Sequence, residues 1–122
     1  MNKNKTGVWG EIYSAWYLRD NGFDIVLSNY YSYFGEIDLA AFKNDILHII
    51  EVKTRGEDPL YAPALAVDIH KQKKIVKTTK VLLSALKLTT AVSFDVVEVT
   101  VDKFNRLVNI NYIEGAFEGG SD

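Results

Sequence analysis

The stretch GEIDLAAFKNDILHIIEVKTR (residues 35–55) holds two apolar runs with strand character around a short polar turn. The runs cover residues 36–42 and 46–53, and Lys-Asn-Asp separates them. Two β-rich runs joined by a polar turn predict a β-hairpin. The ionisable residues Asp38, Glu51 and Lys53 lie inside these otherwise apolar runs, which also contain Glu36 and His48. Their presence in strands that read as core needs a chemical explanation.

The register of this hairpin sets two acids against each other. If Asn44-Asp45 is a two-residue turn, or if the turn has four residues, Asp38 lies opposite Glu51 and Glu36 lies opposite Lys53. The Cβ atoms of directly opposed residues are ~5 Å apart, and like charges at that distance are destabilising. The two carboxylates therefore need a cation, and Lys53 already has Glu36 as its partner. A divalent metal meets this need, and oxygen ligands suit Mg²⁺ or Mn²⁺.

Such a site would suit the hydrolysis of a nucleic-acid backbone. A metal held by one or two carboxylates keeps room for phosphate oxygens, and a nearby lysine stabilises the developing negative charge. The alternative is that E-x-K marks solvated or salt-bridged charges at a sheet edge, where lysine discourages edge pairing. Both interpretations stay open on the residues alone.

The remaining elements predict a mixed sheet with two helices packed against it. The first helix is expected from Thr6, as its cap, to about Asp20, with Asn21-Gly22 as its stop. Its expected apolar side holds Trp9, Ile12, Trp16 and either Tyr13 or Tyr17. The other expected elements are a strand at 23–29, a loop at 56–63, a helix from 64 or 67 to 86, and strands at 92–101 and 107–113. We expect a single domain over residues 1–118 and a flexible tail at 119–122.

Composition favours an ordinary folded domain in the cytoplasm. Of the 122 residues, 48% are hydrophobic and 25% are charged, which is near the average of globular proteins. The absence of cysteine excludes disulfides and thiolate metal sites, and it fits a reducing compartment. No apolar run approaches the ~18 residues of a membrane span, and no apolar segment follows the N-terminal lysines. We therefore expect no contact with a membrane.

One segment is basic on an otherwise acidic chain of net charge −2. Residues 69–94 contain no Asp or Glu, whereas six lysines lie between Lys71 and Lys87. On the predicted helix, Lys73, Lys77 and Lys80 share one face. This face is either the solvated side of the helix or a surface that neutralises phosphates.

The order of these motifs resembles the PD-(D/E)xK nuclease superfamily, which has the restriction-endonuclease-like fold. More narrowly, the chain resembles the YraN-like family of endonuclease-related proteins. The matching segments cover about residues 7 to 99, and they are GVWGEIYSAWYLRDNGFDIVLSN, GEIDLAAF, IIEVKTR, the lysine-bearing helix and FDVVEV. The resemblance implies an α/β fold with a mixed sheet flanked by helices. It further implies a Mg²⁺- or Mn²⁺-dependent endonuclease that acts on nucleic acid, DNA rather than RNA, with branched DNA as one candidate substrate.

Site residues follow from the resemblance position by position. It implies Asp38 and Glu51 as metal ligands, the carbonyl of Val52 as a further metal contact, and Lys53 as the catalytic lysine. Glu11, in the matched Gly-Glu pair of the first helix, completes the site in this comparison, although an acid there also favours the helix macrodipole. The expected nucleic-acid contacts are Lys71, Lys73, Lys77, Lys80 and Arg55. Lys71 and Gln72, early in the long helix, either reach the site or form part of its exposed polar face.

Two departures from the family pattern keep a second function open. The family usually has an arginine shortly after the position of Asn29 and another before the Phe-Asp-Val strand, where this chain has Tyr30-Tyr31 and Ser93. A module of the same fold that binds nucleic acid, or acts as a scaffold, without cutting is therefore the alternative. A dimerisation protein that uses the strand at 107–113 as an edge is a third hypothesis, and homodimers are common among resolvase-like enzymes of this fold.

Several other residues allow two interpretations. The aromatic cluster before the hairpin either packs in the core or stacks on bases, and it consists of Tyr30, Tyr31, Tyr33 and Phe34. His48 points away from Glu51 by strand parity, so we interpret it as structural. Asp95 lies among apolar strand positions and is expected to contact a helix or a loop.

Overall fold

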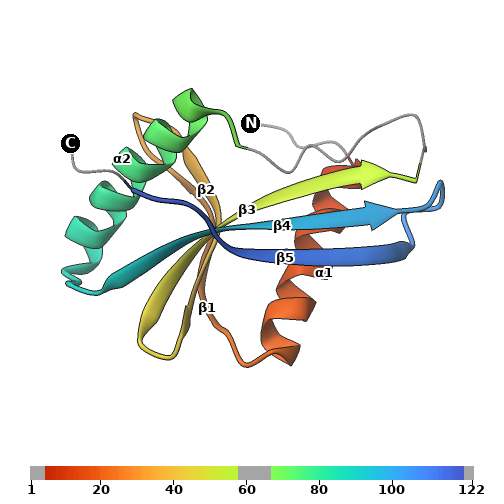
Figure 1. The fold of residues 1–122 in the computed structure, drawn as a ribbon, viewed down its shortest axis with the longest axis horizontal. Coiled ribbons are helices and arrows are strands. Elements are labelled where there is room, and N and C mark those ends of the chain that lie inside the picture. Colours follow the sequence, from red (N-terminus) through yellow and green to blue (C-terminus); the bar gives the residue numbers. More distant parts are fainter. Residues whose placement is uncertain (1–4, 58–66, 120–122) are drawn as a thin grey trace.

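The computed structural model describes residues 5–57 and 67–119, which form two helices and five strands (Figure 1). The elements are α1 (Lys5–Asp20), β1 (Asp24–Tyr31), β2 (Glu36–Lys43), β3 (Ile46–Gly56), α2 (Ile69–Leu86), β4 (Ala91–Val101) and β5 (Leu107–Phe117). Each helix and strand expected from the sequence is present. The predicted loop at 56–63, the earlier of the two helix starts and the end of the tail lie largely outside the described residues. Within these residues, no helix is long and apolar enough to span a membrane.

The strands form one mixed sheet in the order β1-β2-β3-β4-β5. β3 and β4 are parallel, and the other neighbouring pairs are antiparallel. Parallel neighbours need a crossover connection, and α2 provides it between β3 and β4. This arrangement confirms the predicted α/β class, and it is that of a restriction-endonuclease-like fold.

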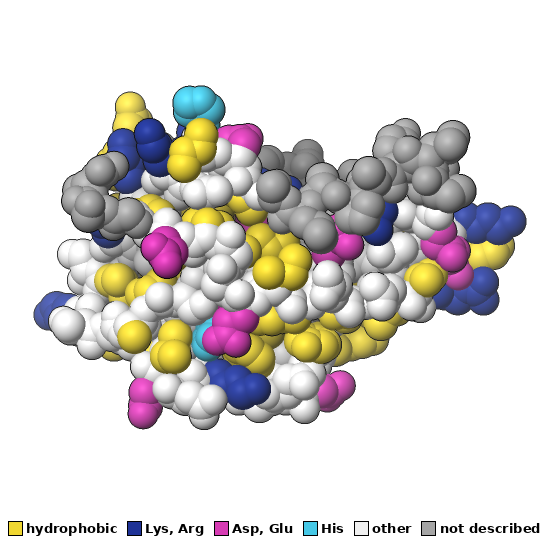
Figure 2. Space-filling model, viewed as in Figure 1, with side chains coloured by type: hydrophobic (Ala, Val, Ile, Leu, Met, Phe, Trp, Pro, Cys, Tyr) yellow, Lys and Arg dark blue, Asp and Glu magenta, His cyan; other side chains and the backbone are white. Residues whose placement is uncertain are grey.

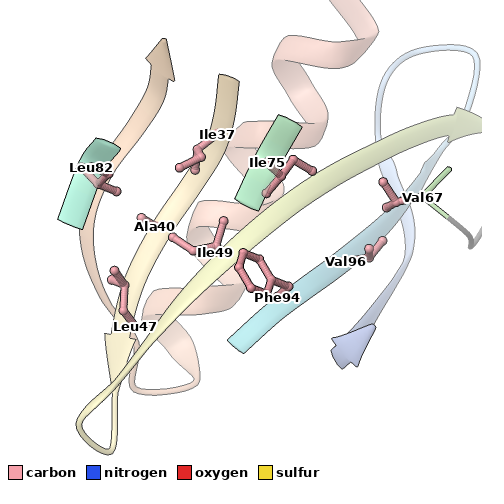
Figure 3. Packing of buried hydrophobic residues seen from close by; sticks show 9 residues of the cluster. All are labelled: Ile37, Ala40, Leu47, Ile49, Val67, Ile75, Leu82, Phe94 and Val96. Carbon is pink, nitrogen blue, oxygen red and sulfur yellow. The ribbon is translucent and has the colours of Figure 1, made fainter. Parts of the chain in front are cut away.

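The two helices cover opposite faces of the sheet, so the protein has two cores. On one face Ile75 and Leu82 of α2 pack on the strands, as Figure 3 shows. That cluster contains Ile37, Ala40, Leu47, Ile49, Val67, Ile75, Leu82, Phe94 and Val96. On the other face Leu18 of α1 packs against Leu39, Ala41, Ile50, Val97, Val99 and Val101. Because β2, β3 and β4 are covered on both sides, they are almost continuously apolar, and any charge within them is conspicuous.

The α1 helix packs through small residues, which the sequence analysis did not predict. Its buried residues are Gly10, Ser14 and Leu18, whereas Trp16, expected on the apolar side, is 52% exposed. A Cβ atom on Gly10 would lie only 1.7 Å from Oγ1 of Thr54 in β3. The helix therefore approaches the sheet more closely than any larger residue would permit. Thr6 is also not a cap, because it lies within the first turn of α1 and its hydroxyl contacts Oδ1 of Asn105 at 3.2 Å.

Local sequence signals define the C-terminal end of α1 and the N-terminal end of α2. Gly22 has a φ of +83° just after α1, which confirms the predicted stop at Asn21-Gly22. At the start of α2 the side chain of Asp68 accepts a hydrogen bond from the backbone N–H of Lys71 at 3.0 Å. That N-cap places the first turn of α2, which carries Lys71, at a defined position over the sheet.

The hairpin turn is the two-residue form. Lys43 pairs with Ile46, and the two residues between them, Asn44 and Asp45, have φ values of +53° and +63°. Positive φ at both central positions is the type I′ geometry, whose twist matches that of the flanking strands. This turn fixes the register of β2 against β3.

Replacing Asp45 with glycine is expected to raise the free energy of unfolding by roughly 0.5–1 kcal/mol. Glycine adopts the left-handed conformation without the steric cost that a side chain carries there. The contact of the Asp45 carbonyl with the Thr90 hydroxyl, at 3.2 Å, is kept because it uses the backbone. Urea denaturation followed by circular dichroism measures the change, and a midpoint that is unchanged or lower would contradict this interpretation of the turn.

A buried carboxylate on the α1 side joins three strands. Asp95 in β4 is fully buried and accepts hydrogen bonds from the hydroxyls of Ser93 and Tyr112, from the backbone N–H of Gly115, and from Nδ1 of His48 at 2.6 Å. Burial, the hydrogen bond to Asp95 and the charge of Asp95 together raise the pKa of Tyr112. His48 therefore has a structural contact, as expected. The partners of Asp95 lie on β3, β4 and β5 rather than on a helix or loop, so that prediction was wrong.

Candidate active site

The hairpin brings Asp38 and Glu51 together below the first turns of α2. Strand pairing runs from Lys43 with Ile46 to Leu39 with Ile50. Just beyond this last pair, the side chains of Asp38 and Glu51 interact through their charges and a hydrogen bond. Both side chains are buried, and they line one narrow cleft together with Ile49 and Ile75. Oδ2 of Asp38 accepts a hydrogen bond from the backbone N–H of Val52 at 2.8 Å, which orients the carboxylate across the hairpin. The predicted juxtaposition of the two acids is thus present.

The charge of Glu51 is disfavoured in this position. Burial, followed by the charge of Asp38, raises the pKa of Glu51 from 4.5 to about 7, although Lys71 acts in the opposite direction. A carboxyl group with a pKa near neutrality exchanges protons and cations readily at physiological pH. Strongly shifted carboxyl groups in a cleft are typical of functional sites.

Lys71 of α2 supplies the cation that the sequence analysis sought between the acids. Its ammonium group forms an ion pair with Oε2 of Glu51. Partial burial acts to lower the pKa of Lys71, but the hydrogen bond to Glu51 and the charges of Glu51, Asp38 and Glu36 outweigh it, so the pKa is raised. Lys71 was predicted as a nucleic-acid contact. The structure places it at the carboxylates, which was the alternative interpretation of its position early in the helix.

Glu36 is a further acid at the site that the sequence analysis assigned elsewhere. It lines the same cleft as Asp38 and Glu51, and its Oε2 atom is buried without a hydrogen-bond partner among the described residues. The expected pairing of Glu36 with Lys53 lies beyond the last pair of the β2–β3 ladder. A buried carboxylate oxygen without a partner is costly, and a bound cation is one way to satisfy it.

The donor set fits a hard divalent ion only in part. Asp38 and Glu51 supply two carboxylates, which is the usual number for Mg²⁺ when waters and phosphates complete the coordination. Within residues 5–57 and 67–119, however, no three His, Asp or Glu side chains converge closely enough to hold a metal. Two carboxylates alone leave most coordination positions of a divalent ion to other ligands.

Lys53 and Arg55 follow Glu51 on the same face of β3, two and four residues along the strand. Lys53 is half-buried and pairs in register with Glu98 of β4. The guanidinium of Arg55 lies 3.6 Å from Oε1 of Glu98, so this predicted nucleic-acid contact is engaged in an ion pair. The roles predicted for Lys53 and for the Val52 carbonyl stay predictions.

Glu11 is held by β1 through the Asn29 side chain. Nδ2 of Asn29 donates a hydrogen bond to Oε1 of Glu11 at 3.0 Å, and Asn29 itself has a φ of +53°. Glu11 also lines a hollow with Trp16 and Leu39 on the α1 side of the sheet. Its contribution to the carboxylate site stays a prediction.

The exposed side of α2 is basic, as predicted. Lys73, Lys77 and Lys80 are exposed, and Lys74 joins them. Figure 2 shows Lys and Arg side chains over α2, at the upper left, beside hydrophobic ones. The helix that carries Lys71 to the carboxylates therefore also presents exposed cationic side chains to the solvent.

Comparison with known proteins agrees with the order of motifs. Residues 10–99 match the sequence profile of the Uncharacterised protein family UPF0102. The chain belongs to the UPF0102 family. This is the YraN-like family that the sequence resembles, so the predicted membership is confirmed, while the UPF0102 description itself assigns no activity.

Relatives from distant bacteria share nearly the full length of the chain. A UPF0102 protein of Clostridium botulinum (strain Eklund 17B / Type B) is 41% identical over 91% of this chain and 92% of its own. One from Clostridium acetobutylicum is 34% identical over 97% of both chains. One from Helicobacter pylori (strain P12) is 38% identical over 91% of this chain and 96% of its own. The similarity thus extends over nearly the whole length of each of these proteins.

Proposed function

We propose that this UPF0102 protein is a metal-dependent nuclease that hydrolyses phosphodiester bonds of nucleic acid. The observation that carries the proposal is the buried pair of acids, Asp38 and Glu51, held side by side in the hairpin with Lys53 two residues further along β3. Burying two like charges is costly, and a protein gains from doing so where the pair serves as a ligand set. The resemblance to PD-(D/E)xK nucleases supports the same assignment.

Each residue has a distinct role in this proposal. Asp38 and Glu51 would hold Mg²⁺ or Mn²⁺, and the carbonyl of Val52 would be a further contact. When bound, the ion supplies Lewis-acid polarisation of the phosphodiester and lowers the pKa of a coordinated water. Lys53, on the same face as Glu51, stabilises the negative charge that develops on the phosphate. The resemblance alone assigns Glu11 to this site, because its side chain lies on the α1 side of the sheet with Asn29.

Lys71 neutralises Glu51, and it would have to leave the carboxylate for Glu51 to hold a divalent ion. The ion pair joins a lysine that is still half-exposed to a carboxylate that is 5% exposed, so the lysine can leave towards the solvent more easily than the acid can. The exposed lysines of α2 contact the nucleic-acid backbone, with DNA preferred to RNA. A protein without cysteine that acts on nucleic acid is expected in the cytoplasm.

The test is cleavage of a labelled panel of single-stranded, duplex, flapped and four-way-junction DNA, with matched RNA, in Mg²⁺ and Mn²⁺. Asp38→Asn is expected to lower the cleavage rate by at least about a hundredfold, because it removes one of two ligand charges. Asp45→Asn, which makes the same change on an exposed turn, is the matched control and is expected to cut like the wild type. Undiminished cutting by Asp38→Asn would refute the proposal.

The Lys71–Glu51 ion pair favours a second candidate, a nucleic-acid-binding module without catalysis. In that case Lys71 permanently satisfies the acids, and the basic face of α2 carries the function. Binding would then survive Asp38→Asn but weaken in Lys73→Gln/Lys80→Gln, with the salt slope falling by roughly one unit for each lost phosphate contact. Salt-dependent binding without cleavage in any metal would favour this candidate over the nuclease.

A further inference from the structure

The turn between β1 and β2 is fixed to α2 by a set of short polar contacts. The backbone N–H of Ser32 donates to the carbonyl of Gly35 at 2.8 Å, and the N–H of Phe34 donates to the Ser32 hydroxyl at 3.1 Å. The same hydroxyl lies 2.9 Å from the hydroxyl of Thr78 in α2. A Cβ atom on Gly35 would come within 3.3 Å of Cβ of Lys74, so the turn lies directly against the helix. The side chains at its tip are consequently held in a defined place.

This ordered turn presents aromatic rings to the solvent. Tyr33 is 97% exposed and Phe34 is 42% exposed, and their rings meet edge to face with centroids 5.5 Å apart. Core packing, one of the two interpretations of this cluster, is therefore wrong for Tyr33. It holds in part for Tyr30, which packs against the α2-side core. Neighbouring exposed aromatic rings on an ordered turn form an apolar surface of the kind that binding sites use.

A groove of about 470 Å³ runs from this turn to the carboxylate site. Tyr31, Phe34, Lys74 and Lys71 line it, and Glu36 belongs both to this groove and to the cleft that contains Asp38 and Glu51. Its volume is within the range of sites that take a small ligand or one nucleotide-sized group. The aromatic surface and the two acids are thus neighbouring parts of one concave region.

The charges of the groove suit a polyanion with flat, apolar groups. Lys74 lines it, and Nζ of Lys77 lies 5.6 Å from the centre of the Phe34 ring. Of its two acids, Asp68 is engaged in capping α2 and Glu36 lies towards the carboxylates. Proteins that bind single-stranded nucleic acid commonly combine aromatic rings that stack with bases and basic side chains that neutralise phosphates. A duplex cannot offer the same faces, because its bases are paired and stacked on each other.

We infer that this groove binds an unpaired nucleotide, with its base against Tyr33 and Phe34 and its phosphates towards Lys74 and Lys77. The substrate class is therefore single-stranded nucleic acid, or a structure with unpaired bases beside the scissile bond. The inference deepens the proposed function and rests on it for the cleavage step. The binding step stands on the turn, the rings and the lysines alone.

The test measures binding without cleavage, in EDTA, to an oligonucleotide that carries 2-aminopurine, as a DNA or RNA strand and as the corresponding duplex. The wild type is expected to bind the single strands at least about tenfold more tightly than the duplexes and to quench the 2-aminopurine fluorescence by stacking. Tyr33→Ala is expected to weaken single-strand binding roughly tenfold and to lose most of the quenching, while Tyr33→Phe keeps both. Because Tyr33 is almost fully exposed, neither change threatens the fold.

Phe104→Ala is the matched control. Phe104 is 65% exposed and lies between two cations, Lys103 and Arg106, but it belongs to the β4–β5 turn, away from the groove. The control variant is expected to bind like the wild type. Equal affinity for single strand and duplex, an unaffected Tyr33→Ala, or an equal loss in Phe104→Ala would each overturn the inference. If the binding results hold while Asp38→Asn still cuts, the proposed catalytic site fails and the nucleotide-binding groove stands.

Discussion

Replacing Gly10 with alanine is expected to lower the free energy of unfolding by about 3 kcal/mol. Helix propensity alone predicts the opposite, because alanine is favoured over glycine by about 1 kcal/mol inside a helix. The contact between Gly10 and β3 determines whether the substitution raises or lowers the free energy of unfolding. A Cβ atom at this position would lie 1.7 Å from Oγ1, 2.8 Å from Cβ and 2.9 Å from Cγ2 of Thr54, so α1 must shift away from the sheet. Thermal and urea denaturation measure the change.

A double-mutant cycle separates this clash from other effects of the substitution. Thr54→Ala removes the two outer atoms that the new methyl group meets, so Gly10→Ala in that background should recover part of the lost stability. A coupling free energy of at least about 1 kcal/mol is expected for two residues in such direct contact. A Gly10→Ala variant as stable as the wild type would show that α1 does not lie this close to β3.

Glu51→Gln is expected to stabilise the metal-free protein at neutral and alkaline pH. The pKa of Glu51 is raised to about 7 in the folded protein, so the folded state holds its proton where the unfolded state, with the ordinary value of 4.5, has lost it. The contribution of this group is therefore fully present below about pH 4.5 and is lost as the pH rises to about 7, by roughly 3 kcal/mol in total. Glutamine mimics the protonated acid and does not lose this contribution.

The readout is the difference in unfolding free energy between Glu51→Gln and the wild type, measured in EDTA at several pH values. This difference should grow between pH 4.5 and 7 and then stay constant. Glu118→Gln, a change at an exposed acid, is the control and should show no such growth. A difference that is the same at pH 5 and pH 8 would mean that Glu51 titrates normally.

Comparing the stability of the wild type and Glu51→Gln with and without Mg²⁺ or Mn²⁺ tests whether Glu51 is a metal ligand. An ion that binds the folded wild type raises its stability by mass action, whereas Glu51→Gln has lost a ligand and should respond much less. The stability gained by the variant in EDTA would then shrink in the presence of the metal. An equal response of both proteins would argue against Glu51 as a ligand.

The parts of the structure that the sequence predicted are those governed by local rules. The hairpin register followed from strand periodicity and a two-residue turn, so the juxtaposition of Asp38 and Glu51 could be deduced from residues only a dozen apart. The restriction-endonuclease-like sheet followed from the order of the elements and from the resemblance. Both are properties of neighbouring segments.

The parts that could not be predicted depend on how distant segments meet. The aromatic residues of α1 suggested a broad apolar face, yet the helix packs through Gly10 and Ser14 because close approach, rather than side-chain size, governs that contact. The pairing of Lys71 with Glu51 depends on where the crossover helix crosses the sheet. Tyr33 is chemically suited to a core, and only the contacts of its turn with α2 show that it faces the solvent.

The hairpin also has a consequence for the order of events in folding. The pairing of β2 with β3 closes a loop of only two residues. The parallel pairing of Ile46 with Ala91 closes a much longer loop, which includes the whole of α2. Short loops close at a smaller entropic cost and far sooner than long ones. We therefore expect the two acids to meet before α2 is in place to deliver Lys71, and their repulsion to act on the early hairpin. The protein should accordingly refold faster below about pH 4.5, where Glu51 is largely protonated even in the unfolded chain.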